Sequence, residues 1–164
     1  VVSTIRNLID GRTAKITFDD VPDYYWLGRI SVRNADRAKR LGKFTIYCYA
    51  DAHKYENGSA QEDILWDDVD FETTIFRYIG ELTVSGSYDL YVEPSDRKTV
   101  PVFTVSDITS ETFTVKSNRL AGKTFTLQSG RNRFPELKVC GPQQVKLTFT
   151  GSAKVSVEYR GGSL

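Results

Sequence analysis

The sequence predicts a mainly β protein in two parts, with a short helix at its start. Short runs of alternating apolar and polar residues succeed one another from residue 83 onward, most of them separated by Gly, Pro, Asn or Ser clusters. Strand signals at intervals of about 8–12 residues, with turn residues between them, are typical of antiparallel β-sandwiches and jelly rolls. Helical spacing of apolar residues is clear only at residues 1–9.

The N-terminal part combines this helix with strands. Apolar residues at positions 1, 2, 5, 8 and 9 follow the helical period, and Asp10-Gly11 ends the predicted helix. Strands are expected at 16–18 and 24–32, with the turn sequence DDVPD between them. Residues 34–41 have a weaker helical pattern and are a candidate for a second short helix.

A third strand, KFTIYCY (43–49), alternates strictly between two sets of residues. Side chains of a strand point alternately to its two faces, so we expect one face to be buried. The residues expected to be buried are Phe44, Ile46 and Cys48, and those expected on the opposite face are Thr45, Tyr47 and Tyr49.

The C-terminal part contains the regularly spaced strands, which are LTVSG, YDLYVE, VPVFTVS, TFTVK, KTFTLQ, ELKVC, QVKLTFT and AKVSVEY. In the last of them, apolar and polar residues alternate with high β propensity, which predicts a strand paired inside this part. Val155, Val157 and Tyr159 should point to one side, and Lys154, Ser156, Glu158 and Arg160 to the other.

Composition disfavours several functional classes. The formal net charge of +1 over 164 residues disfavours nucleic-acid binding driven by bulk electrostatics. No apolar run approaches the roughly 20 residues of a membrane span, so no membrane insertion is expected. A Ser/His/Asp triad would depend on the single histidine, His53, in a polar stretch, and Cys48 and Cys140 are too few for a zinc site. We therefore expect no enzyme, cofactor or metal.

Charge is concentrated in two blocks of opposite sign. The basic block consists of Arg29, Arg33, Arg37, Lys39, Arg40 and Lys43, and the acidic block consists of Glu62, Asp63, Asp67, Asp68, Asp70 and Glu72. The linker-like stretch HKYENGSAQ lies between them, so we place a domain boundary near Ser59, with domains at 1–60 and 61–164. 

Each of these features has competing interpretations. The acidic block is either a calcium loop or a solvated or interface-facing edge, and its lack of an EF-hand glycine favours the edge. The basic block lacks aromatic residues at its centre, which favours a solvated or partner-binding surface over a single-strand platform. Tyr24, Tyr25 and Trp26 either stack on a sugar or belong in part to the core, since consecutive strand residues point to both faces. Paired carboxylates of a glycoside hydrolase are the least favoured interpretation.

The order of several motifs resembles the siphophage distal tail (Dit) protein family. ITFDDVPDYYWLGRISV and LGKFTIYCYADAHKYE are similar to the first domain of that family, and SGSYDLYVEPSDRKTVPVFTVS to the passage into its second domain. The ending LTFTGSAKVSVEYRGGSL is similar to the family's C-terminus, with Ser152-Ala153 in place of the usual second glycine. Relative to that family the chain lacks the extreme N-terminal part, so a truncated first domain is expected.

The resemblance implies a structural role at the tail tip of a phage or prophage. Such proteins form hexameric rings that join the tail tube to the tail-associated or receptor-binding apparatus, after assembly in the bacterial host cytoplasm. The first domain forms the ring around the channel through which DNA leaves, and the second is a galectin-like antiparallel β-sandwich. No sequence-specific nucleic-acid binding is implied. The alternative function is a carbohydrate-binding β-sandwich that acts as an adhesion module.

A ring requires two different complementary patches on each subunit, because its interface is heterologous. The two charge blocks are candidates for these patches. The candidate subunit-interface residues are Arg33, Arg37, Lys39, Arg40, Asp67, Asp68 and Asp70. The competing interpretation is that the blocks pair within one subunit or face water.

Overall fold

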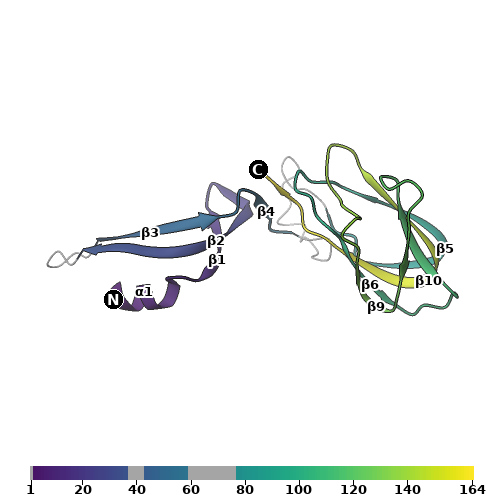
Figure 1. Ribbon diagram of the computed structural model, residues 1–164, viewed down its shortest axis with the longest axis horizontal. Helices are drawn as coiled ribbons and strands as arrows, with labels where there is room; N and C mark the ends of the chain where they lie inside the picture. Colours follow the sequence, from purple (N-terminus) through teal and green to yellow (C-terminus); the bar gives the residue numbers. More distant parts are fainter. Residues whose placement is uncertain (1, 37–42, 59–76) are drawn as a thin grey trace. The chain divides into compact units, whose positions relative to one another are not determined.

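The computed structural model describes residues 2–36, 43–58 and 77–164, and it divides into two compact units, Val1–Tyr55 and Glu56–Leu164 (Figure 1). Both units consist mainly of antiparallel β-strands, which confirms the mainly β part of the prediction. The boundary expected near Ser59 falls among residues outside the described ranges. 

Unit 1 is a small antiparallel sheet with one helix beside it. After α1 (Val2–Ile9), β1 (Thr13–Phe18) pairs with β2 (Val21–Asp36), and β2 pairs along its other edge with β3 (Lys43–Ala50). The end of α1 is fixed to β2, because the Val32 N–H donates to the Asp10 carboxylate at 2.9 Å. This hydrogen bond lowers the pKa of Asp10, with help from Arg6 and against a smaller effect of burial.

The register of β2 and β3 sorts their side chains onto two faces. Arg29 and Ser31 lie opposite Tyr49 and Tyr47, and the alternate pairs, Ile30 with Cys48 and Val32 with Ile46, lie on the other face. The predicted alternation of this strand is therefore present.

The burial predicted for β3 is wrong. The side chain of Ile46 is 45% exposed and Cys48 is exposed, as are Thr45, Tyr47 and Tyr49 on the opposite face; the side chain of Phe44 lies outside the described residues. The physical reason is that β3 belongs to a single-layer sheet, and the described part of unit 1 supplies no second layer over Ile46 and Cys48. Alternation thus predicts which residues share a face of the strand, but not whether other residues cover that face.

The helix suggested at 34–41 is also wrong where the structure describes it. β2 continues as a strand to Asp36, with Asp36 opposite Lys43 across an irregularity in the ladder, and residues 37–41 lie outside the described ranges. Pairing with β3 overrides the weak helical pattern, because tertiary contacts routinely outweigh local propensity.

Unit 2 is arranged around one long strand, β10 (Val145–Glu158). β5 (Glu81–Val92) pairs along one edge of β10, and β7 (Phe113–Ser117) and then β6 (Val102–Ser106) pair along the other. The outer strands are β8 (Thr124–Leu127) beside β7 and β9 (Gly130–Arg133) beside β6. Short strands β4 (Lys54–Glu56) and β11 (Gly162–Ser163) complete the elements.

Two glycines face each other at the middle of the long strand pair. Gly86 of β5 lies opposite Gly151 of β10, and their φ angles of 85° and 118° are positive, where only glycine is readily accommodated. The pair β7–β8 joins β10 before this point and β6–β9 joins it after. Phe125 of β8 and Phe134, just beyond β9, then meet with ring centroids 4.8 Å apart, which nearly closes the sheet.

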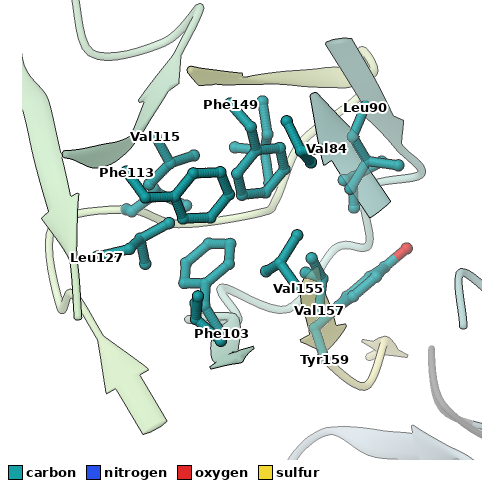
Figure 2. Close-up of a cluster of buried hydrophobic side chains, with 14 of the residues drawn as sticks. Val84, Leu90, Phe103, Phe113, Val115, Leu127, Phe149, Val155, Val157 and Tyr159 are labelled. Atoms are coloured by element: carbon teal, nitrogen blue, oxygen red, sulfur yellow. The ribbon is translucent and has the colours of Figure 1, made fainter. Parts of the chain in front are cut away.

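The core lies inside this nearly closed sheet (Figure 2). The Phe149 ring contacts both Phe113, stacked at 5.9 Å, and Phe103, edge-on at 6.0 Å. Val155, Val157 and Tyr159 are only 1%, 0% and 4% exposed, and the intervening residues of the same strand are partly or fully exposed. The predicted sidedness and pairing of the last strand are confirmed.

We predict that Gly151→Ala lowers the free energy of unfolding of unit 2 by about 2–5 kcal/mol. An added Cβ would lie 2.4 Å from the Thr112 carbonyl oxygen and would also strain the backbone at φ 118°. Hydrogen exchange of unit 2 amides under increasing denaturant measures the effect separately from unit 1. Gly58→Ala is the matched control, because a Cβ there meets nothing within 4 Å. Equal protection in both variants would contradict the prediction.

Candidate interaction surfaces

Within residues 2–36, 43–58 and 77–164, no three His, Cys, Asp or Glu side chains are grouped so that they could hold a metal ion. The same part of the chain has no helix of sufficient length and apolarity to cross a membrane. The acidic block and its calcium alternative lie outside the described residues.

Of the seven candidate subunit-interface residues, the structure describes the side chain of Arg33 alone. Arg33 is exposed on β2, with its guanidinium carbon 5.7 Å from the Tyr47 ring centroid. The other six lie outside the described ranges; they are Arg37, Lys39, Arg40, Asp67, Asp68 and Asp70.

One face of unit 1 combines cations with aromatic rings across three strands. We call it the basic–aromatic face and define it by Lys15, Tyr25, Arg29, Arg33, Tyr47 and Tyr49. Antiparallel register places these residues together, since Arg29 lies opposite both Thr13 of β1 and Tyr49 of β3, and Lys15 lies opposite Leu27. Side chains of directly opposite residues share a face of the sheet.

Two cation–aromatic pairs are formed on this face. The Lys15 ammonium lies 4.2 Å from the Tyr25 ring centroid, and Arg33 lies over Tyr47. Tyr25 also stacks on Tyr55 with centroids 5.4 Å apart. Tyr47 and Tyr49 remain 41% and 60% exposed, so their rings are accessible to a ligand.

Sequence reasoning missed this face because its members are distant in the chain. The basic block has no aromatic residues at its centre, and the tyrosines of β3 come many positions later. Only the register of β2 against β3 supplies the aromatic rings beside the cations. The alternation in KFTIYCY was the available signal, but alternation alone does not specify the pairing partner.

The opposite face of unit 1 is apolar and incompletely covered. Phe18 packs edge-on against Trp26 at 5.4 Å, yet Phe18 is 54% exposed and Ile46 is 45% exposed. Tyr24, Tyr25 and Trp26 are each partly buried, so none of the three is a fully buried core residue. Exposed apolar surface of this kind marks an interaction site more often than a free surface.

Unit 2 contains a buried ion pair at its N-terminal end. The Arg77 Nε and Nη2 groups donate to the two oxygens of Glu56, the second at 2.7 Å, and the side chains are only 4% and 12% exposed. Arg77 Nη1 also donates to the Glu93 carbonyl at 2.6 Å and more weakly to that of Pro94. Burial lowers the pKa of Arg77, but its interactions with Glu56 and Tyr159 raise that pKa by a larger amount. The net effect is a raised pKa, so the guanidinium stays charged.

The C-terminal residues enclose this ion pair. The Arg77 guanidinium lies 5.6 Å from the Tyr159 ring centroid, and the Tyr159 hydroxyl donates to the Glu93 carbonyl at 3.1 Å. Arg160 donates to the Glu56 carbonyl at 2.7 Å, and Gly161 approaches the Glu56 carboxylate so closely that a Cβ would lie 2.4 Å from its oxygens. These contacts join the C-terminal residues to both members of the ion pair.

No protein-family model, curated protein or solved structure matches the chain.

We predict that Glu56→Gln lowers the free energy of unfolding of unit 2 by about 3–5 kcal/mol, because the buried Arg77 loses its counter-charge. Chemical denaturation with hydrogen exchange of unit 2 amides gives the value. The control is Glu136→Gln, which removes an ion pair with Lys123 whose side chains are 57% and 56% exposed and should cost less than about 1 kcal/mol. Similar losses in the two variants would show that the buried pair is dispensable.

Burial raises the pKa of Tyr159, and the nearby Arg77 only partly opposes this. A raised pKa in the folded state means that the neutral phenol stabilises the fold below the unfolded pKa of about 10, and that this stability is lost at higher pH. We predict that the free energy of unfolding of unit 2 is higher in the wild type than in Tyr159→Phe, and that this difference is larger at pH 8 than at pH 11. A gap that is the same at both pH values would contradict this.

Proposed function

We propose that the chain is a structural component of a phage or prophage tail tip, a distal tail protein that joins the tail tube to the tail-associated or receptor-binding apparatus. In this proposal unit 1 belongs to a hexameric ring and unit 2 is a galectin-like β-sandwich attached to it. The protein would assemble in the bacterial host cytoplasm and reside at the virion tail tip.

The observation that carries the proposal is the incomplete covering of unit 1. Leu8, Phe18 and Ile46 are 56%, 54% and 45% exposed, whereas unit 2 encloses Phe103, Val157 and their neighbours completely. A single-layer sheet with this much exposed apolar surface is stabilised when a partner covers it. An assembling unit joined to a self-sufficient one is the organisation that a ring with attached outer domains requires.

The charge blocks support a head-to-tail arrangement. The basic block and the acidic block have opposite signs and six members each, which suits the two different patches of a heterologous interface. Exposed ion pairs contribute only about 0–1 kcal/mol each, so they would orient subunits and speed association while apolar contact supplies affinity.

We predict that the purified chain forms oligomers that weaken with salt. Changing Arg37, Lys39 and Arg40 to Glu should abolish them, and adding Asp67, Asp68 and Asp70 changed to Lys should restore them. Ile46→Lys should also dissociate them, because it places a charge on the apolar face. Sedimentation velocity at low and high salt measures each state.

The matched control for Ile46→Lys is Tyr91→Lys, which changes a 59% exposed residue of unit 2 and should leave assembly unchanged. A monomer under every condition would reject the ring. Antibodies against the chain should label the distal tail tip of virions produced from the genome that encodes it. Saturable binding to cell-wall sugars without tail labelling would favour the carbohydrate-binding alternative.

A further inference from the structure

We propose that the basic–aromatic face of unit 1 binds single-stranded nucleic acid without sequence preference. This inference goes beyond the proposed structural role, and it depends on the face opposite to the apolar one. It assigns Arg29 and Arg33 of the basic block to the nucleic acid, which leaves Arg37, Lys39, Arg40 and Lys43 of that block for the subunit contact. The ligand class follows from two properties that occur together on this face, a local excess of positive charge and accessible flat rings.

The positive charge is local to unit 1. Residues 1–55 contain ten basic and six acidic residues, a net charge of +4, although the whole chain carries only +1. Lys15, Arg29 and Arg33 are all exposed on the face. Phosphates are attracted by such a cluster through release of their counterions, which does not require the rest of the chain to be basic.

Two exposed carboxylates, Asp23 and Asp51, lie near the Tyr25 end of the face; Asp23 is two residues before Tyr25 on β2. Asp51, which follows β3, accepts a hydrogen bond from the Tyr55 hydroxyl at 2.7 Å, and Tyr55 itself stacks on Tyr25. This carboxylate is thereby held at the β4 end of the face. Arg29 and Arg33 lie further along β2, opposite Tyr49 and Thr45.

The aromatic rings distinguish a nucleic acid from other polyanions. Tyr47 and Tyr49 lie two residues apart on β3, so both project from the same face with 41% and 60% of their surface exposed. Bases stack on such rings regardless of sequence, and a planar guanidinium such as that of Arg33 over Tyr47 adds a second flat surface. A sulfated or phosphorylated polymer without bases would contact the cations alone.

Single strands fit this surface better than duplexes. In a duplex the base faces are stacked on one another and hidden, whereas a single strand can present them to exposed tyrosines. Duplex recognition instead requires an element that enters a groove and contacts base edges. The face is carried by the strands of an open sheet, which supplies a platform rather than such an element.

The test is fluorescence anisotropy of a labelled oligo-dT probe with the full chain. Tyr47→Ala and Tyr49→Ala should each weaken binding by about 5- to 150-fold, from the loss of one stacking contact. Arg29→Gln and Arg33→Gln should each reduce the slope of log affinity against log salt by about 0.7, and the tyrosine variants should leave that slope unchanged.

The matched controls lie on unit 2, where Lys146 approaches the exposed Tyr91 ring at 6.0 Å. Tyr91→Ala and Lys146→Gln reproduce the chemistry of the tested changes and should leave binding unaltered. Circular dichroism and sedimentation of every variant separate loss of binding from loss of folding or assembly. If variants that do not assemble still bind oligo-dT, this inference stands even if the ring proposal fails.

Three results would overturn the proposal. The first is no binding to oligo-dT at low salt by the folded wild type. The second is competition by polyphosphate or duplex DNA as effective as by unlabelled oligo-dT, with Tyr47→Ala and Tyr49→Ala binding like the wild type. The third is dissociation of oligomers by the tyrosine variants, which would make the face a subunit contact.

Discussion

The buried ion pair between Glu56 and Arg77 is the constraint on which the start and the end of unit 2 depend. These two residues are 21 positions apart in the chain, and their hydrogen bonds hold the start of the unit against the residues that precede β5. The same guanidinium donates to the carbonyl oxygen of Glu93, the residue after β5, and it lies over the Tyr159 ring, while Gly161 lies against the Glu56 carboxylate. Replacing a buried pair by apolar residues is often neutral, so its value lies in fixing which segments meet.

The two units differ in how they cover a β-sheet. In unit 2 the paired glycines lie at the middle of β5 and β10, and β7–β8 pairs with β10 before them and β6–β9 after them. Phe103, Phe113 and Phe149 pack against one another in the core between these strands. The described part of unit 1 has three main strands and one helix of eight residues, too little to bury both faces of its sheet. The first unit is therefore where interaction with other molecules is expected, on chemically distinct faces.

Strand register determines the chemistry of those faces. Arg29 and Arg33 are ordinary surface cations in the linear sequence, and Tyr47 and Tyr49 are ordinary strand residues. Antiparallel pairing places them side by side, while the next residue on each strand contributes to the apolar face. A net charge near zero for the whole chain conceals this local arrangement, because electrostatic attraction depends on charges within about a Debye length of about 8–10 Å.

The sequence by itself determined the β class and the inward side of the last strand of unit 2, because period-two alternation is a local property. It did not determine the division of unit 2 into strands: β5 and β10 each join two of the predicted strands, and the predicted strand ELKVC contributes only an isolated bridge at Val139. It identified Arg33 as a surface residue but assigned Ile46 and Cys48 to a core that unit 1 does not have. Alternation states which residues share a face, and only the tertiary structure states what covers that face. The basic–aromatic face and the Glu56–Arg77 pair likewise join residues 10 or more positions apart in the chain, such as Lys15 with Tyr25 and Arg33 with Tyr47. Strand register and long-range closure decided both, and neither is encoded in a local pattern.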